Sequence, residues 1–149
     1  MLTRSGTIVA VCISRERGER KSSVASAACR VDYGIEGDAH AGPGIRQVSF
    51  LAMKDIREME ALGIELQPGD FAENIIVDSD VLDAIQPGDM LQVEGGPAFI
   101  VTQIGKDCHN DNCPIKIKTG TCVMPERGVF TRVITSGTIQ PGQHITQNP

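Results

Sequence analysis

Short runs of valine, isoleucine and threonine recur along the chain and predict a protein built mainly of β-strands. Glycine and proline lie between these runs, in motifs such as Pro68-Gly69-Asp70 and Pro87-Gly88-Asp89, where we expect the chain to turn. The strands are expected at residues 6–14, 24–31, 47–52, 74–77, 90–93, 98–104, 129–134 and 144–146. Many short strands separated by such turns are typical of a β-barrel or a β-sandwich.

One segment, at about residues 53–62, has the spacing of an amphipathic helix instead. Charged residues, Asp55 among them, cover the other helical faces, and Gly63 is suited to end the helix. The apolar residues that share one face are Met53, Ile56, Met59 and Leu62. We expect this helix to form a lid on the barrel. The predicted fold class is therefore α+β, predominantly β, with one clear helix and short additional helical turns.

The composition is that of a soluble globular protein, and we expect one domain over residues 1–149. A formal net charge of −5 and an aromatic content of 3% argue against a nucleic-acid partner. No apolar run reaches the roughly 18 residues that a membrane-spanning helix needs, and the first residues lack the pattern of a secretory signal. These observations predict a cytoplasmic protein that binds neither nucleic acid nor membrane.

Five cysteines in a reducing compartment are expected to be free thiols, ligands or reactive groups. Cys12 and Cys29 lie within apolar runs and are expected in the core. Cys108 lies in a polar stretch at the end of a predicted strand, two residues after Lys106. If the strand continues, both side chains point to one face, and an ammonium group near a thiol favours the reactive thiolate. Cys108 is therefore the leading candidate for a nucleophile or a metal ligand.

The neighbouring cysteines leave two alternatives open. Cys113 either forms a disulfide with an oxidised Cys108 or packs beside Pro114. A zinc site is less favoured, because the spacing lacks the paired cysteines of structural zinc sites. The four residues that offer zinc ligands are Cys108, His109, Cys113 and Cys122. A thiol-based redox protein or a metal-responsive interaction protein is the function that corresponds to these alternatives.

A glycine-rich stretch at residues 34–49 is the second candidate region. Arg46 and Ser49 offer donors suited to a phosphate or another oxyanion. For His40 and Arg46 a ligand-binding role and a structural role both stay open, whereas Asp38 is expected to cap neighbouring amides. Asn74 either orients a ligand or closes a turn.

The basic segment at residues 15–23 is expected to be a solvated loop rather than an anion site. The common sequence motifs for phosphate loops, dinucleotide binding, serine hydrolases and zinc proteases are absent. The residues alone thus predict a reactive thiol beside an anion-binding loop and leave the substrate open.

Five motifs, in the same order and over most of the chain, resemble the MOSC domain, which is named for the C-terminal part of molybdenum-cofactor sulfurase. The motifs are GIEGDAHAGP-x₂-RQVSF (34–50), PGDFAENI (68–75), VTQIGKDCH (101–109), CVMPERGVFTRV (122–133) and SGTIQPGQHI (136–145). The pattern is most similar to the small stand-alone bacterial members. The resemblance implies a MOSC-type β-barrel in which Cys108 is the reactive cysteine.

The resemblance implies that Cys108 either carries sulfur as a persulfide for metal–sulfur centres or ligates molybdenum in the molybdopterin cofactor. The residues that would line the cofactor pocket are His40, Arg46, Ser49, Asn74, Lys106 and Arg132. The alternative is a molybdenum-dependent reductase of N-hydroxylated compounds, which requires an external electron donor. Whether the protein is an enzyme, with sulfurtransferase-like or reductase activity, stays open.

Larger sulfurases contain a separate pyridoxal-phosphate domain, and related reductases contain an additional β domain; neither fits in 149 residues. We therefore expect pyridoxal phosphate only on a separate partner protein. The expected partners are a cysteine desulfurase-type sulfur donor, or an enzyme or biosynthesis protein of the molybdenum cofactor.

Overall fold

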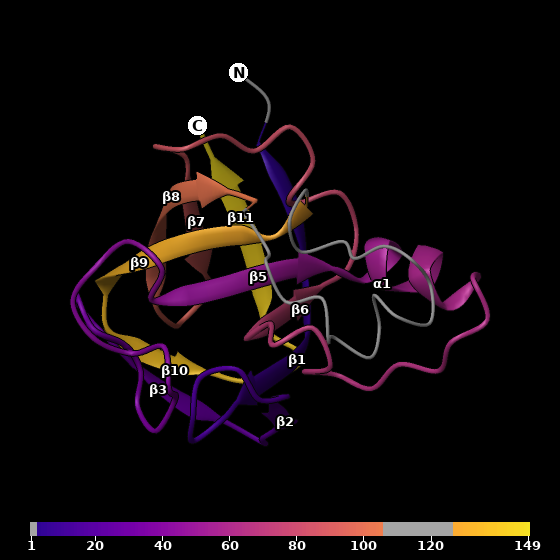
Figure 1. Cartoon of the computed structure of the whole chain (residues 1–149). Coiled ribbons are helices and arrows are strands. Elements are labelled where there is room, and N and C mark those ends of the chain that lie inside the picture. Colours follow the sequence, from indigo (N-terminus) through magenta and orange to yellow (C-terminus); the bar gives the residue numbers. More distant parts are fainter. Residues whose placement is uncertain (1–2, 106–126) are drawn as a thin grey trace.

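A closed β-barrel is the main element of the structure, a computed structural model that describes residues 3–105 and 127–149 (Figure 1). Seven strands form it in the order β11-β7-β8-β9-β5-β6-β1, and pairing of β11 with β1 closes the ring. Their bounds are β1 Arg4–Ile13, β5 Val48–Ala52, β6 Ile75–Val77, β7 Met90–Val93, β8 Ala98–Ile104, β9 Val129–Thr135 and β11 His144–Asn148. Strands β5 and β6 are parallel, whereas the other neighbours in the ring are antiparallel.

A small antiparallel sheet lies beside the barrel and contains β3 (Ala27–Arg30), β4 (Gly34–Ile35) and β10 (Gly137–Ile139) in the order β10-β3-β4 (Figure 1). A further short strand, β2 (Ser22–Ser23), pairs with the end of β1. Cys29, Ile35 and Ile139 of the small sheet belong to the same buried cluster as the barrel interior. The small sheet and the barrel therefore share one core.

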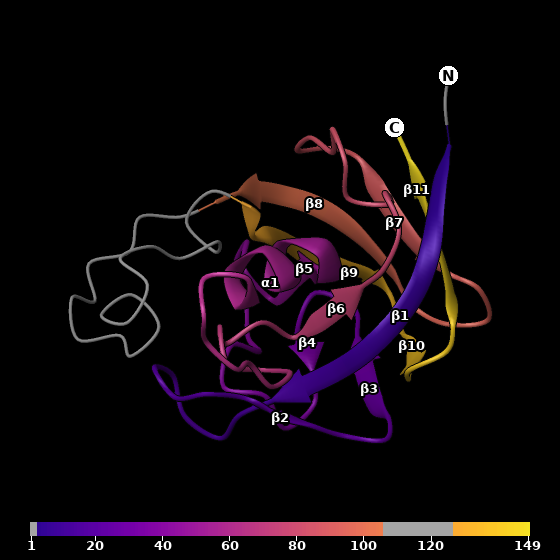
Figure 2. The same cartoon turned by 90° about the vertical axis from the view of Figure 1, so that its right-hand side faces the viewer.

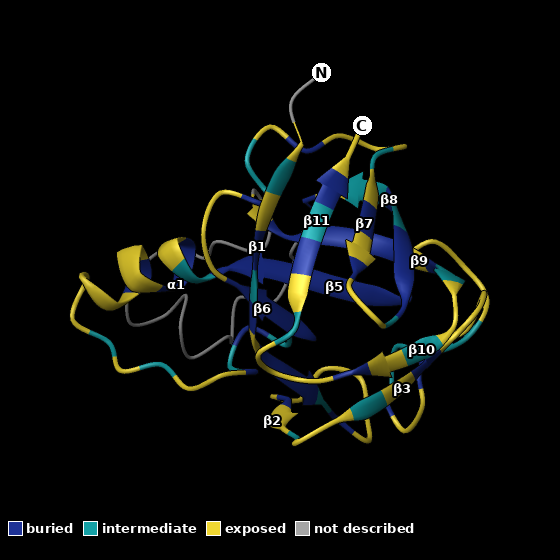
Figure 3. Ribbon diagram, turned by 180° about the vertical axis from the view of Figure 1, so that it is seen from behind, coloured by how far each residue is buried: buried dark blue, intermediate teal, exposed yellow. Residues whose placement is uncertain are grey.

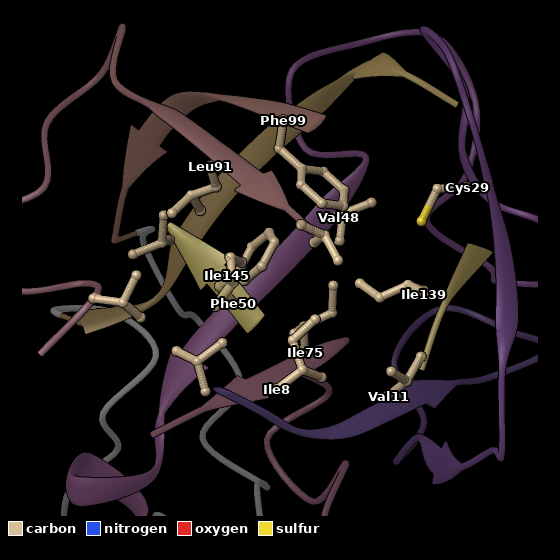
Figure 4. Close-up of a cluster of buried hydrophobic side chains, with 14 of the residues drawn as sticks. Ile8, Val11, Cys29, Val48, Phe50, Ile75, Leu91, Phe99, Ile139 and Ile145 are labelled. Carbon is tan, nitrogen blue, oxygen red and sulfur yellow. The ribbon is translucent and has the colours of Figure 1, made fainter. Parts of the chain in front are cut away.

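The barrel interior is filled by apolar side chains that alternate along the strands, as a half-buried pleated strand requires (Figure 4). Phe50 of β5 and Phe99 of β8 lie at its centre with their ring centroids 5.0 Å apart in an edge-to-face arrangement. Both are fully buried. Ile8, Leu91 and Ile145 come from three other strands and complete this packing (Figure 4).

A second buried cluster lies on the outer face of the barrel wall, where α1 (Met53–Glu60) packs. Ile56 and Met59 of the helix contact side chains that alternate with the interior residues of the strands. The strand residues of this outer cluster are Ala10, Cys12, Leu51, Ile76 and Phe130. The helix thus covers the wall from outside rather than closing an end of the barrel as a lid (Figure 2).

The predicted fold class, predominantly β with one clear helix, is confirmed for the described part of the chain, and each of the eight predicted strands corresponds to an observed one. The short strands β2, β4 and β10 were not predicted, because two or three residues are too few to show an alternating pattern. No helix within residues 3–105 or 127–149 is long and apolar enough to cross a membrane.

Three further expectations about the helix are wrong. Leu62 is 56% exposed because the helix ends at Glu60, so Leu62 no longer follows the helical spacing. Asp55 is buried rather than solvated, because it lies in the first turn and accepts a hydrogen bond from Arg127 at 3.1 Å. Gly63, which was expected to end the helix, has a φ of +97° but lies two residues beyond the observed C-cap, Ala61.

Candidate functional site

The described residues that sequence analysis assigned to a cofactor pocket are His40, Arg46, Ser49, Asn74 and Arg132. Lys106 and Cys108 lie outside the described residues, as do His109, Cys113 and Cys122. The segment that contains them follows Gly105 and precedes Arg127, and the two flanking glycines are joined by a hydrogen bond from the Gly105 amide to the Gly128 carbonyl at 2.7 Å. No cluster of three potential metal-ligating side chains occurs in the part of the chain that the structure describes.

Ser49 and Asn74 lie on the outer face of the wall and bond to each other. Ser49 alternates with the interior residues Val48 and Phe50 along β5, and Asn74 immediately precedes β6. The Asn74 Oδ1 atom accepts hydrogen bonds from the Ser49 backbone amide at 2.9 Å and from the Ser49 hydroxyl at 3.3 Å. In return, the Ser49 Oγ atom accepts a hydrogen bond from the Asn74 backbone amide at 3.0 Å. The Asn74 side-chain amide nitrogen, Nδ2, donates to the Cys12 carbonyl at 3.0 Å. These two buried side chains therefore join β5, β6 and β1.

A buried ion pair lies on the same part of the molecule. The Lys21 ammonium is 2.7 Å from Asp38 Oδ1, and neither side chain has any exposed surface. Asp38 also accepts hydrogen bonds from the backbone amides of Ser14 at 3.1 Å and His40 at 3.2 Å. The expectation that Asp38 caps neighbouring amides agrees with this geometry.

The pKa of Asp38 is lowered, which is unusual for a buried carboxyl. Burial by itself raises this pKa, but hydrogen bonds from the Lys21 side chain and the Ser14 amide, the charge of Lys21 and a hydrogen bond from the Asn74 side chain outweigh that effect. Asp38 is therefore a carboxylate held by its partners at neutral pH.

Lys21 is the residue of this site that sequence analysis missed. The expectation of a solvated loop is correct for Arg15 to Arg20, which are exposed, but Lys21 is 3% exposed. The two residues that follow it pair with β1, so the chain has already turned back onto the barrel at this point. The one available signal for the burial of Lys21 was the start of a strand-like pattern directly after the basic segment. This pattern is too short to predict a strand.

The two arginines lie on the outer face with exposed guanidinium groups. Arg46 lies 5.7 Å from the ring centroid of Phe130, and its Nε donates to Gln103 at 3.2 Å. Phe130 is directly opposite Ser49 in the ladder, and Arg132 follows it by two residues on the same face of β9. Arg132 lies 3.3 Å from Asp32 and is 46% exposed.

Both described cysteines are buried free thiols, as predicted. Burial raises the pKa of Cys12 to about 12, with a further rise from Glu73 and an opposing effect of Lys21, and burial raises the pKa of Cys29 to about 12. A thiol with so high a pKa is protonated at neutral pH and is a poor nucleophile. Neither cysteine fits the role that sequence analysis gave to Cys108.

A cavity of about 410 Å³ lies beside the first turn of α1 and contains none of the predicted site residues. Its charged side chains pair with each other, Lys54 with Asp83 and Arg127 with Asp55. This cavity therefore offers no unbalanced charge to a ligand.

No protein-family model matches this chain, and no curated protein sequence matches it. Solved structures do match over almost the whole chain. The YuaD protein from Bacillus subtilis has a TM-score of 0.80 at 16% identity, and the match covers 99% of this chain and 98% of that one. YiiM from Geobacillus stearothermophilus has a TM-score of 0.69 at 18% identity, covering 97% and 75% of the two chains. YiiM from Escherichia coli has a TM-score of 0.66 at 13% identity, covering 98% and 70%.

The backbone fold is similar to that of YiiM. YiiM is a MOSC-domain protein, and its backbone arrangement is shared by this chain. At identities of 13–18% the likeness concerns the fold, and function has to be argued from the residues of this chain.

Proposed function

We propose that this protein is a MOSC-type module in which the Cys108 thiolate handles sulfur or molybdenum, either as a persulfide carrier or as a ligand to the metal of the molybdopterin cofactor. His40, Arg46 and Arg132 contact the bound group together with Lys106, and Ser49 and Asn74 form the floor beneath them. The protein acts with a partner that supplies sulfur or exchanges the cofactor.

The observation that supports this proposal is the convergence of five residues from distant motifs on one outer face of the barrel. His40 contacts Lys21 and Asp38, and Asn74 is hydrogen-bonded to Ser49. Arg46 lies over the ring of Phe130, which is opposite Ser49 in the sheet, and Arg132 follows Phe130 by two residues. The strand connection that contains Cys108 leaves from β8 and returns to β9, two strands of this same wall. These residues come from motifs spread over the sequence between His40 and Arg132, and binding residues often gather on one surface of a rigid scaffold.

The donor set on this face fits an anionic group. Two exposed guanidinium groups and an imidazole offer planar and directional donors for phosphate oxygens or for a thiolate. When bound, molybdenum supplies the redox chemistry, and the thiolate is a soft ligand of the kind that such metals accept. The task of this chain's own residues is to bind the phosphate end, exclude competing orientations and keep the thiol deprotonated.

As a sulfur carrier, the protein would need a donor that already holds a persulfide. The Cys108 thiolate attacks the terminal sulfur of the donor persulfide, a new S–S bond forms on Cys108, and the donor S–S bond breaks with release of the donor thiolate. The step is redox-neutral overall, because the transferred sulfur keeps its oxidation state and no external oxidant is consumed. A cysteine desulfurase is a donor of this chemical class.

Native mass spectrometry of protein purified without air and without reductant, from cells supplied with molybdate, tests the proposal. Wild type is expected to carry the mass of one extra sulfur or of an intact molybdopterin, and Cys108→Ser is expected to carry neither. Cys113→Ser and Cys122→Ser are the matched controls and should keep the added mass. An adduct that survives in Cys108→Ser, or wild type without any adduct, would contradict the proposal.

Arg46→Ala tests the anion-binding part, with Arg30→Ala as its control. Both guanidinium groups lie over an aromatic ring, Arg46 at 5.7 Å from Phe130 and Arg30 at 5.2 Å from Tyr33, but Arg30 lies in the small sheet. Loss of a charged hydrogen bond should lower cofactor retention by about tenfold or more in Arg46→Ala only. Reaction of the Cys108 thiol with an alkylating reagent should remain in both variants, and equal retention in both would exclude Arg46 from the site.

A further inference from the structure

The Lys21 ammonium group has a complete and unusual set of partners. Its Nζ atom lies 2.7 Å from Asp38 Oδ1, 3.1 Å from Ser14 Oγ and 2.9 Å from His40 Nδ1. An ammonium has three protons to donate and no lone pair to accept with. The three protons are therefore matched by three acceptors, and one of those acceptors is an imidazole nitrogen.

This arrangement determines where the proton of His40 lies. A nitrogen that accepts a hydrogen bond from an ammonium holds no proton itself, so Nδ1 is the acceptor and the neutral ring has its proton on Nε2. We propose that Lys21 is the positioning residue of the candidate site, which holds His40 as a neutral imidazole that presents its Nε2–H to the bound group. This inference rests on the proposed function for the identity of that group.

Asp38 would dictate the opposite arrangement if Lys21 were absent. Its Oδ2 atom lies 3.9 Å from His40 Nδ1, and a carboxylate that faces an imidazole nitrogen draws a proton onto it. The Lys21 ammonium is 2.9 Å from that nitrogen, closer than Asp38 is, and it also binds the other carboxylate oxygen, Oδ1, at 2.7 Å. Lys21 thus prevents the carboxylate–histidine pair that a site with Asp38 and His40 alone would form.

The backbone fixes Lys21 in this position independently of its side chain. The Lys21 amide donates to the Gly69 carbonyl at 2.9 Å, and Gly69 packs so closely that a Cβ atom there would lie 2.0 Å from the Lys21 carbonyl oxygen. The His40 ring, in contrast, is 30% exposed and reaches the surface of the site. A rigid buried cation therefore orients a ring that a ligand can reach.

The consequence for recognition is a division of tasks among the basic residues. His40 offers a directional Nε2–H bond without a positive charge. Arg46 supplies the charge, together with Arg132, whose guanidinium also pairs with Asp32. The acceptor that fits this donor is an anionic oxygen or a thiolate sulfur of the bound group, because each accepts a hydrogen bond from a neutral N–H.

Nuclear magnetic resonance of the ligand-free, ¹⁵N-labelled protein tests the assignment directly. Long-range proton–nitrogen correlations distinguish a protonated from an unprotonated ring nitrogen, and at about pH 8 an ordinary histidine is neutral. We expect His40 of the wild type to show an unprotonated Nδ1 and a protonated Nε2. A protonated Nδ1 in the wild type would overturn the proposal.

Removal of the lysine should reverse the pattern. In Lys21→Met we expect Nδ1 to become protonated and to donate to Asp38. Because this variant leaves a buried carboxylate without its partner, the second test is Lys21→Met combined with Asp38→Asn, which removes both charges. There we expect a measurable share of protein with the proton on Nδ1. A ring that keeps Nδ1 wholly unprotonated in the variants that fold would show that Lys21 does not set the tautomer.

Two substitutions of the histidine test the direction of donation. The side-chain amide nitrogen of glutamine reaches the place of Nε2, whereas that of asparagine reaches the place of Nδ1. His40→Gln should retain the sulfur or cofactor mass about tenfold better than His40→Asn, the effect of one hydrogen bond to a charged acceptor. Equal loss in both variants would overturn the Nε2 assignment, whereas wild type without any added mass contradicts the proposed function and leaves the resonance result valid.

Discussion

Glu73 is a carboxylate with no exposed surface, and its environment makes the stability of the fold depend on pH. It accepts hydrogen bonds from the backbone amides of Gly69 and Phe71, each at 3.0 Å. Burial raises the pKa of Glu73 from its ordinary 4.5 to about 6, and these hydrogen bonds offset the rise only in part. The folded protein therefore holds a proton on Glu73 more tightly than the unfolded chain does.

We predict that Glu73→Gln removes this dependence. The stabilising contribution of protonated Glu73 is complete below pH 4.5 and is lost as the pH rises through about 6. Relative to Glu73→Gln, wild type should lose about 2 kcal/mol of unfolding free energy between pH 4.5 and pH 7.5. Urea denaturation of both proteins at several pH values measures the difference. Because all other groups are shared, two parallel pH profiles would contradict the raised pKa.

Two turns of identical sequence show how one element supports the candidate site. Gln67-Pro68-Gly69-Asp70 and Gln86-Pro87-Gly88-Asp89 both place the aspartate Oδ2 atom 2.8 Å from the glutamine amide. Their glycines have φ values of +91° and +96°. They differ in surroundings, since a Cβ atom at Gly88 would meet nothing within 4 Å, whereas one at Gly69 would collide with the backbone of Lys21.

Gly69→Ala and Gly88→Ala form a matched pair that isolates this close approach. Both variants lose about 1–2 kcal/mol from the left-handed backbone conformation. Gly69→Ala should lose about 2 kcal/mol more, because the backbone of Lys21 has to move. Chemical denaturation measures the two losses, and the His40 ring resonances should change in Gly69→Ala only. Similar losses in both variants would mean that the contact between Gly69 and Lys21 tolerates a methyl group.

The elements that could be predicted from the sequence are those with a hydrophobic run of several residues and a clear turn at each end. Strands β7 and β8 begin and end where the hydrophobic runs do, because each run is bounded by a glycine or proline turn. The burial of Lys21 was not predictable, since a charged residue is buried only when a partner distant in sequence neutralises it, and Asp38 is 17 residues away. The same holds for Asp55 and its partner Arg127, 72 residues away.

At the scale of the whole molecule, the barrel separates packing from chemistry. The inward face of the strands fills the interior, and β5 and β9 are buried along most of their length (Figure 3). On the wall of β9, β5, β6 and β1 the outward face holds the helix and the candidate polar site. The motifs in the sequence predicted which residues belong to the candidate site, but the shared location of these residues follows from the neighbouring positions of β9, β5, β6 and β1 in the ring. This strand order brings together strands that are distant in sequence. The alternation of apolar and polar residues along each strand shows which face is buried but not which strands are neighbours.

The sharing of one core predicts how the molecule unfolds. Tyr33, the single tyrosine in a chain without tryptophan, lies between β3 and β4, and Arg30 of β3 packs over its ring at 5.2 Å. Tyrosine fluorescence thus reports on the small sheet, whereas far-ultraviolet circular dichroism is dominated by the barrel. Because Cys29, Ile35 and Ile139 are packed into the barrel core, we expect both signals to change at the same urea concentration.

Ile139→Ala sharpens this test. Ile139 belongs to the small sheet and is fully buried, so its truncation should destabilise the fold by about 2–5 kcal/mol. If the two sheets unfold as one unit, the fluorescence and dichroism transitions of the variant shift together by the same amount. Ile145→Ala, in the strand that closes the barrel, is the matched control and should shift both transitions in the same way. A fluorescence transition that precedes the dichroism transition in Ile139→Ala would mean that the small sheet detaches first and that its contacts with the barrel are too weak to couple them.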